Sequence, residues 1–123
     1  MLREVADVHQ RNGEPKRRWF QSAEEDLIVW YGDDNSIVGF QLCYDRPRYE
    51  RALTWWRGRG FAHDKVDDGE GSALTYKRTA ILVPDGPFDA TRVLERFEAA
   101  ARELPPDLVH FVCAKLRQYP AGE

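Results

Sequence analysis

The residue types that hold metal ions and move protons gather in one stretch of this chain of 123 residues. His63 and Asp64 are adjacent, and Asp68 follows within the acidic segment 67–71 (Asp-Asp-Gly-Glu-Gly). Carboxylate oxygens are ligands for hard cations, and a histidine beside them can act as a general base. The segment lacks the regular Asp spacing and distal Glu of an EF-hand, and it lacks the second His or Cys that zinc usually needs. A solvated acidic loop is therefore the favoured interpretation. A metal-dependent or acid–base enzyme centred on His63, Asp64 and Asp68 is the alternative.

A second chemical pattern lies just before it, in residues 55–61 (Trp-Trp-Arg-Gly-Arg-Gly-Phe). Aromatic rings can stack on bases while guanidinium groups contact phosphates, so Arg57 and Arg59 beside two tryptophans suggest a nucleic-acid-binding module. With 18 basic and 21 acidic residues the formal net charge is 18 − 21 = −3, which argues against a uniformly basic face. The same stretch also fits an ordinary hairpin tip. Nucleic acid is therefore an alternative partner and not the expected one.

Arrangements for nucleophilic catalysis or cofactor binding are absent from the sequence. His9, His63 and His110 are far apart, and the spacing assembles no Ser-His-Asp or Cys-His group. No P-loop, dinucleotide fingerprint, nucleophile elbow or zincin motif is present. Cys43 and Cys113 are too few for a disulfide framework, and two reduced thiols are the default in a chain without an export signal. The sequence thus favours a non-enzymatic protein with no cofactor.

The elements that position these residues are strands in the first two-thirds of the chain. Aromatic and β-branched residues suit a pleated, packed surface, and ten of the fifteen aromatic residues lie between Trp19 and Phe61. Polar segments rich in Gly and Pro separate the strands, among them a predicted two-residue turn at Gly58-Arg59. The expected strands are Val5–Gln10, Arg17–Gln21, Asp26–Tyr31, Ile37–Tyr44, Tyr49–Trp56, Phe61–Val66 and Ala73–Val83.

The last third of the chain is predicted to be helical. Asp89 is a suitable N-cap, and apolar residues recur at helical spacing as far as Leu104. Pro105 and Pro106 end this helix and begin a second one, because proline is tolerated in the first turn of a helix. The two helices are therefore expected to form a hairpin.

Strands followed by a helical hairpin predict an α+β fold. We expect an antiparallel meander sheet of about six to seven strands (residues 4–83), with the C-terminal helical hairpin (residues 89–118) packed on one face, in a single domain of residues 1–123. The longest apolar runs, 27–31 and 80–83, are far shorter than the roughly 20 residues of a membrane span. Charged residues also interrupt the N-terminus where a signal peptide would place its apolar segment. We therefore expect a cytoplasmic protein with no membrane partner.

Because successive strand residues point to opposite faces, the turns assign each residue to one of two faces. The face expected to lie under the helices carries Leu27, Val29, Tyr31, Val38, Phe40, Leu42, Tyr44, Leu53 and Trp55. The opposite face is expected to carry Ile28, Trp30, Ile37, Gly39, Gln41, Cys43, Thr54, Trp56, Phe61 and His63. In this register Trp30 lies opposite Gly39, whose missing side chain leaves room for the indole.

The opposite face contains more apolar side chains than a solvated sheet face normally has. A large exposed apolar patch usually marks an interface or a ligand site. Three interpretations remain open: the sheet curls and buries both faces without functional meaning, two copies form a homodimer, or the face binds a small apolar or aromatic ligand. In the last two, aromatic residues supply contact area, and polar ones orient the partner. The residues expected at this ligand or interface site are Ile28, Trp30, Gln41, Thr54, Trp56, Phe61 and His63.

Overall fold

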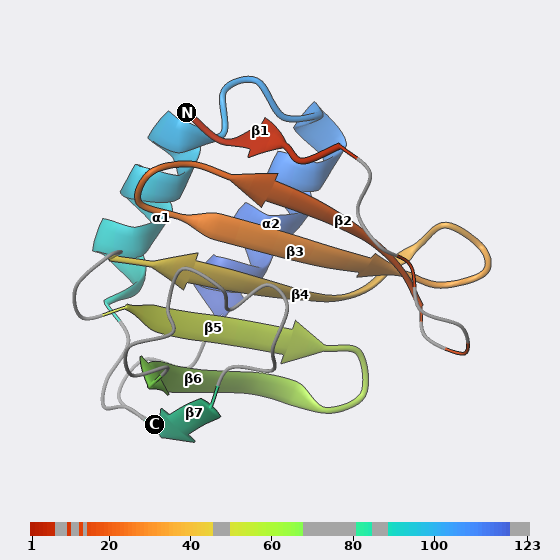
Figure 1. Ribbon diagram of the computed structural model, residues 1–123, viewed down its shortest axis with the longest axis horizontal. Coiled ribbons are helices and arrows are strands. Elements are labelled where there is room, and N and C mark those ends of the chain that lie inside the picture. Colours follow the sequence, from red (N-terminus) through yellow and green to blue (C-terminus); the bar gives the residue numbers. More distant parts are fainter. Residues whose placement is uncertain are drawn as a thin grey trace.

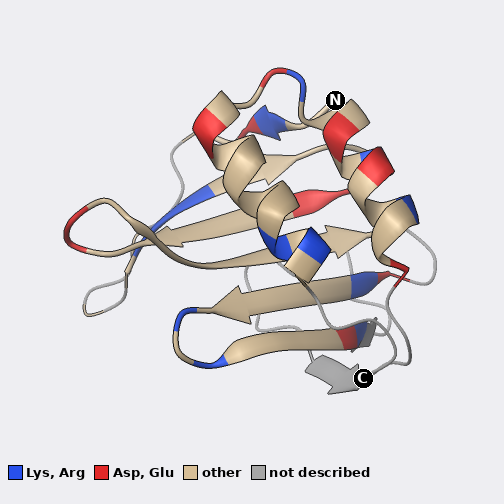
Figure 2. Ribbon diagram, turned by 180° about the vertical axis from the view of Figure 1, so that it is seen from behind, with Lys and Arg blue, Asp and Glu red and all other residues tan. Residues whose placement is uncertain are grey.

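An antiparallel meander sheet with two helices against one face makes up the structure, a computed structural model (Figure 1). The structure describes residues 1–6, 10, 13, 15–45, 50–67, 81–84 and 89–118, with the backbone alone at 66, 67 and 81–84. Consecutive strands are neighbours in the sheet, in the order β1 (Arg3–Glu4), β2 (Lys16–Gln21), β3 (Asp26–Tyr31), β4 (Ile37–Tyr44), β5 (Arg51–Trp56), β6 (Gly60–Asp67) and β7 (Ile81–Pro84). The helices α1 (Ala90–Ala100) and α2 (Pro106–Gln118) lie on the same side of the sheet (Figure 2). These findings confirm the predicted α+β fold.

Local sequence signals set the starts of both helices. The side chain of Asp89 accepts a hydrogen bond of 3.2 Å from the backbone N–H of Arg92, as expected for the N-cap of α1. Val93 and Phe97, four residues apart on one face of α1, are both buried. α2 begins at Pro106, as predicted. In the described part of the chain, neither helix is long and apolar enough to cross a membrane.

Alternate residues of the middle strands form the core beneath the helices. Most of the face predicted to lie there is buried: Leu27, Val29, Phe40, Leu42, Tyr44, Leu53 and Trp55. Phe20 of β2 joins this core, and Tyr31 packs against it. Burying one such side chain contributes roughly 1.5–3 kcal/mol. This layer therefore holds the helical hairpin on one face and leaves the other face without a described helix.

The connection between β3 and β4 contains an irregularity that changes one assignment. Trp30 pairs with Gly39, as predicted, but Tyr31 pairs with Ile37, so Val38 is an additional residue in β4. Such an insertion is accommodated as in a β-bulge. Ile37 therefore packs against the core together with Tyr31, and its predicted place on the opposite face is wrong.

The turn between β5 and β6 is one residue longer than predicted. Trp56 pairs with Gly60, so three residues lie between the strands. Gly58 and Gly60 have φ angles of 83° and 82°, which glycine adopts without a steric penalty. A shift of one residue turns the whole following strand over. Phe61 and His63 therefore lie on the helix face, opposite core residues of β5, and their predicted place on the opposite face is wrong.

The first edge of the sheet differs from the sequence prediction, and the last edge is described only in part. β1 is limited to Arg3–Glu4, and the described residues of the predicted strand Val5–Gln10 are not in a strand. The N–H of Leu2 donates a hydrogen bond of 2.7 Å to the carbonyl of Ala100, which joins this edge to the end of α1. At the other edge, only the end of the predicted strand Ala73–Val83 is described, as part of β7.

Candidate functional site

Two tryptophans lie against each other across Gly39, on the sheet face that the helices do not cover. Gly39 lies between Trp30 of β3 and Trp56 of β5 in the sheet register. The two ring centroids are 4.7 Å apart, and the ring planes are tilted by 31°, a spacing typical of favourable aromatic pairs. A Cβ atom at position 39 would come within 2.5 Å of the Trp56 ring. Glycine is therefore the residue that leaves room for the indole pair.

The neighbouring turns fix where Trp56 lies relative to Gly39. The guanidinium of Arg57 donates to Ser36 Oγ at 2.7 Å and to the carbonyl of Ile37 at 3.1 Å. These bonds join the end of β5 to the turn before β4. The indole pair is thus supported by hydrogen bonds at the same end of the sheet.

A polar pair lies beside the indoles on the same face. Gln41 Nε2 donates a hydrogen bond of 3.0 Å to Thr54 Oγ1. Gln41 pairs across the sheet with Thr54 on one side and with Ile28 on the other. These three residues, Trp30 and Trp56 are all half-buried. The structure therefore brings together five of the seven predicted site residues.

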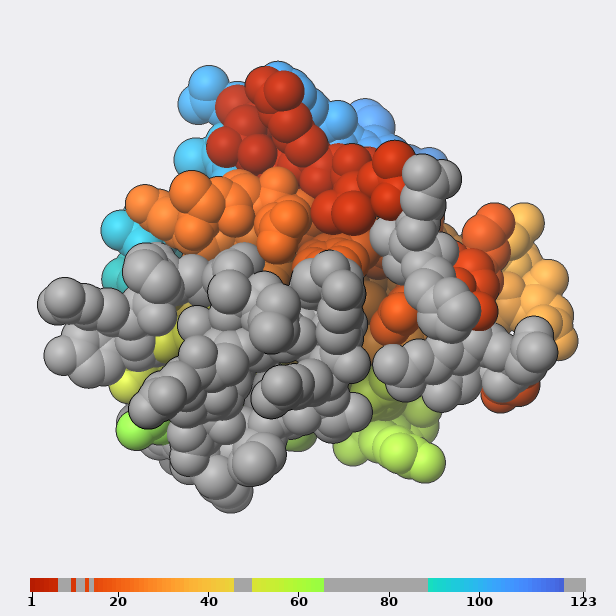
Figure 3. Space-filling view, viewed as in Figure 1, coloured from red at the N-terminus to blue at the C-terminus, as the bar shows by residue number. Residues whose placement is uncertain are grey.

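This face presents a limited apolar surface. Figure 3 shows atoms of β2, β3 and the β5–β6 turn at the surface on the side opposite the helices. Among the described large apolar side chains, only that of Met1 is exposed, at 48%. The aromatic face therefore offers partly covered rings and not a broad exposed plane.

The two remaining predicted site residues belong to the core side. His63 is 6% exposed, and its Nε2 shares a hydrogen bond of 2.5 Å with Tyr44 Oη. The two rings are nearly parallel, with 5° between their planes. Phe61 packs against the hydrophobic core. His63 is thus a hydrogen-bonded core histidine, and neither residue faces the side of Trp30.

The aromatic residues of the predicted nucleic-acid pattern are separated by the sheet. Trp55 and Trp56 are consecutive in β5 and point to opposite faces. Trp55 is buried, with Phe111 at 5.4 Å between ring centroids and Lys115 Nζ at 4.4 Å from the ring centroid. Trp56 is therefore the member of this pair that remains on the side opposite the helices, and Arg57 lies exposed in the turn after it.

Two of the three residues of the predicted metal or acid–base centre lie on opposite faces of the sheet. His63 and Asp64 follow each other in β6, so their side chains point to opposite faces. Asp68 lies outside the described residues. Within the ranges that the structure describes, no group of three or more His, Cys, Asp and Glu side chains is placed to hold a metal ion.

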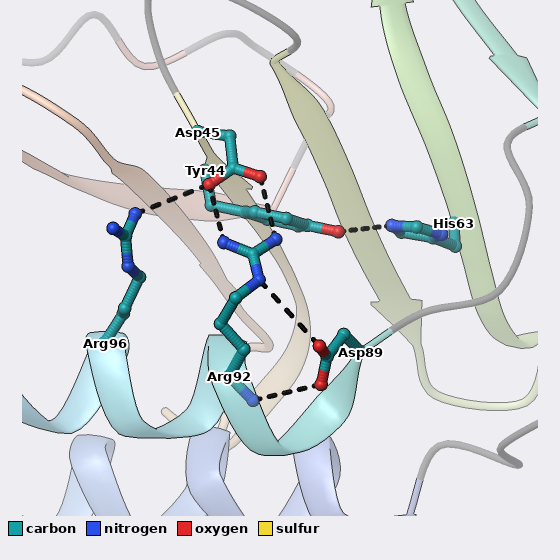
Figure 4. A network of polar contacts seen from close by, with 6 residues as sticks. All are labelled: Tyr44, Asp45, His63, Asp89, Arg92 and Arg96. Atoms are coloured by element: carbon teal, nitrogen blue, oxygen red, sulfur yellow. Dashed lines mark hydrogen bonds and ion pairs between the residues drawn. The ribbon is translucent and has the colours of Figure 1, made fainter.

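A separate polar network joins the end of β4 to α1 (Figure 4). Asp45 accepts hydrogen bonds of 3.0 and 2.9 Å from Arg92, and Arg96 Nη1 lies 3.5 Å from Asp45 Oδ1. The bonds from Arg92 lower the pKa of the Asp45 carboxyl below its usual value. Asp45 has a φ of 63°, in the left-handed region that Asp tolerates better than most residues. This network therefore fixes the helical hairpin to the sheet.

Glu25, in the turn between β2 and β3, is a buried carboxyl near this network. It is 5% exposed, and its Oε2 has no hydrogen-bond partner among the described residues. The pKa of Glu25 is raised to about 7, mainly by burial and also by Glu24 and Asp45, while Arg96 opposes the shift. Glu25 can exchange a proton near neutral pH, but its burial keeps it away from a reactant.

Comparison with known protein families, curated proteins and solved structures gave no match. The choice of candidate binding site therefore depends on the geometry of two clusters, the polar network around Asp45 and the indole pair. The network around Asp45 lies at the junction of helix and sheet, where its charges pair with one another. The indole pair lies on the other face, half-buried and without a described helix over it. It is the better candidate for a binding site.

The two cysteines differ in burial, Cys113 being buried and Cys43 half-buried. Cys43 and Cys113 are both free thiols. Burial raises the pKa of the Cys113 thiol, whereas a reactive thiol needs a lowered pKa. His110, three residues before Cys113 in α2, is exposed while Cys113 is buried, and no hydrogen bond between their side chains is found among the described residues.

Sequence reasoning missed the Asp45–Arg92 link and the buried Glu25. Asp45 and Arg92 are 47 positions apart, and no periodic pattern connects residues at that distance. The one local signal for Glu25 is the serine three residues before it. The hydroxyl oxygen of Ser22 accepts a hydrogen bond of 3.0 Å from the backbone N–H of Glu25. That spacing is typical of a tight turn, but it does not indicate that the carboxyl is buried.

Proposed function

We propose that this chain is a non-catalytic binding domain that holds a small, flat apolar or aromatic ligand against Trp30 and Trp56. The observation that carries the proposal is the indole pair built across Gly39. Stacked and tilted aromatic contacts contribute about 0.5–1.5 kcal/mol beyond area burial. Because both indoles are half-buried, part of each ring remains available to a ligand.

The polar pair beside the indoles supplies orientation. Ligand sites are mostly apolar, with a few placed polar groups that select one orientation of the ligand. Gln41 uses one N–H for Thr54, and an amide nitrogen carries two. The second N–H is suited to an acceptor atom on the ligand, and Ile28 borders the same position.

A homodimer through this face is the competing interpretation. A stable protein interface covers about 800 Å² on each partner. The side chains of this face are half-buried, and Met1 is the exposed large apolar residue among those described. This limited area favours a small ligand over a second copy.

Two free thiols, Cys43 and Cys113, are consistent with a cytoplasmic location.

Ligand-observed NMR with two flat probes, indole-3-acetate and its neutral amide, tests the proposal. We expect at least one probe to bind, and to bind about two- to tenfold more weakly to Trp30→Ala and Trp56→Ala, because each loses about 0.5–1.5 kcal/mol of ring contact. Phe111→Leu removes a ring from α2 in the opposite layer and should keep the affinity of the parent chain.

Light scattering on the same samples tests the dimer. If the parent chain has the mass of a dimer and the Trp30→Glu variant has the mass of a monomer, the face is a protein interface and the ligand proposal is overturned. Probe binding that neither tryptophan variant changes would overturn it as well.

A further inference from the structure

One row of directly paired residues runs across the sheet through the indole pair, and a basic residue lies at each end of this row. The residues of this row are Arg17, Trp30, Gly39, Trp56 and Gly60, each paired with the next. Directly paired residues of antiparallel strands lie on the same face, with Cβ atoms about 4.5–5.5 Å apart. Arg17 is therefore the neighbour of Trp30 on the side away from Trp56.

The other end of the row is open. A Cβ atom built at Gly60 would meet no heavy atom of the described residues within 4 Å, and the same holds at Gly58. Arg59 lies between these glycines, is exposed, and its backbone N–H donates a hydrogen bond of 3.0 Å to the carbonyl of Trp56. A ligand that stacks on Trp56 thus has space toward the hairpin that carries Arg59.

Among the described residues, positive charge exceeds negative charge at this end of the sheet. Figure 2 shows basic segments at the start of β2 and on both sides of the β5–β6 turn. One acidic residue of the β3–β4 turn, Asp34, is already hydrogen-bonded within the turn. It accepts hydrogen bonds from the Ser36 hydroxyl at 2.6 Å and from the Ser36 N–H at 3.0 Å. The described basic residues at this end are Lys16, Arg17, Arg57 and Arg59, and the described acidic ones are Asp33 and Asp34.

Among the described residues, the opposite end of the same face carries both signs of charge, because Arg3 lies in one row of paired residues with Asp26 and Asp64. Asp26 and Asp64 lie at the ends of β3 and β6 that are far from the indole pair, on the same face. An anionic group on a ligand therefore meets mixed charge at that end and is attracted toward Arg17 and Arg59, which lie at the two ends of the row through the indole pair. Guanidinium groups also match a carboxylate geometrically, with two parallel N–H donors.

We propose that the ligand of this face is a small aromatic carboxylate, with its ring against Trp30 and Trp56 and its carboxylate toward Arg17 or Arg59. This inference rests on the proposed function, because it names the chemical class of ligand that the same site takes. A single-stranded nucleic acid would use the same aromatic and basic residues. Because Trp55 is buried on the other face, however, the strand would have only the short stacking surface of Trp30 and Trp56 among the described tryptophans of this pattern.

Isothermal titration of the full chain with the matched pair of probes tests the charge. Indole-3-acetate and indole-3-acetamide share one ring and differ in the carboxylate. We expect the acetate to bind about tenfold more tightly than the amide at low salt, a difference of about 1.4 kcal/mol. The preference should shrink at about 1 M salt, where charges are screened within roughly 3 Å.

The arginine variants locate the charge. Arg59→Gln, in an exposed turn, should reduce the preference for the acetate at least about threefold, and Arg17→Gln should reduce it similarly. Arg102→Gln removes an equally exposed charge from the connection between the helices and should leave the preference unchanged. The binding of the amide should stay the same in all three variants.

The outcomes separate this inference from the proposed function. If both probes bind equally well and neither binds to Trp30→Ala, the carboxylate inference is overturned, while the proposed binding site stands. Absence of binding by either probe would overturn both. Tighter binding of a thymidine oligonucleotide than of the acetate would overturn the carboxylate in favour of a single strand.

Discussion

Gly39 is the residue on which the aromatic site depends, because the ring of Trp56 occupies the space that a side chain would fill. Glycine inside a strand costs about 0.5–1 kcal/mol relative to alanine. The chain therefore accepts a weaker strand at the centre of its sheet. In return Trp56 reaches across to Trp30, and the two rings lie 4.7 Å apart.

Gly39→Ala should destabilise the protein and weaken probe binding together. The new Cβ would lie 2.5 Å from the Trp56 ring, so the indole must leave its position. Overpacking of this kind costs about 1–3 kcal/mol. Unfolding in urea measures the stability, and titration with the indole probes measures the binding.

The same substitution in a Trp56→Ala background provides the control. Without the indole the clash is gone, and alanine should be neutral or slightly stabilising, because it has the better strand propensity. The sign of the effect therefore depends on the partner, as in a double-mutant cycle. An equal cost in both backgrounds would show that Trp56 is not what position 39 accommodates.

At the scale of the elements, turn length decided which residues share a face. The alternation in β3, β4 and β5 was sufficient to predict the pairing of Trp30 with Gly39, and it was confirmed. The β5–β6 turn was predicted one residue too short, which placed Phe61 and His63 on the wrong face. Glycines at both Gly58 and Gly60 allow either length, so the local sequence did not distinguish the two registers.

The attachment of α1 to the sheet is a long-range contact that the sequence pattern could not indicate. Asp45 and Arg92 belong to elements separated by β5, β6 and β7. The periodicity of α1 predicts which side of the helix is apolar and turned to the sheet, and that side is buried as expected. It does not predict which charged residue at the rim finds a partner, because that depends on how the finished layers are aligned.

Asp45→Asn should destabilise the protein by about 0.5–1 kcal/mol at low salt. Asn also tolerates the left-handed backbone at this position, so the change removes charge and little else. The effect is modest because the Arg92 side chain is 43% exposed. Urea unfolding at low and high salt should show the difference from the parent chain shrinking as salt screens the pair.

The effect of Asp45→Asn should also disappear in acid. The pKa of Asp45 is lower in the folded chain than its usual 3.8. Its stabilisation is therefore complete above that value and is lost as the pH falls through the lowered pKa. Asp33→Asn, in the exposed β3–β4 turn, removes the same charge without an arginine partner of this kind and should be near neutral. An equal loss in both variants would contradict a specific role for the Arg92 contact.

For the whole molecule, Glu25 couples stability to pH near neutrality. Its pKa rises from 4.5 to about 7 on folding, mainly because the carboxyl is buried. Between these values the folded chain binds the proton more tightly than the unfolded chain does. The free energy of unfolding should therefore fall as the pH rises from 4.5 to 7, by up to about 3 kcal/mol. The lowered pKa values of Glu4 and Asp45 act below this window.

Glu25→Gln should remove that decline. A glutamine resembles the protonated carboxyl in shape and is never charged, so the variant should match the parent chain near pH 5 and exceed its stability near pH 8. Urea midpoints across this range measure the difference. Glu24→Gln changes the exposed neighbour and should leave most of the slope in place, because Glu24 is a lesser cause of the shift than burial. A parent chain whose stability does not fall between pH 5 and pH 8, or a Glu25→Gln variant with the same slope, would show that the carboxylate at position 25 finds solvent or a cation when it ionises.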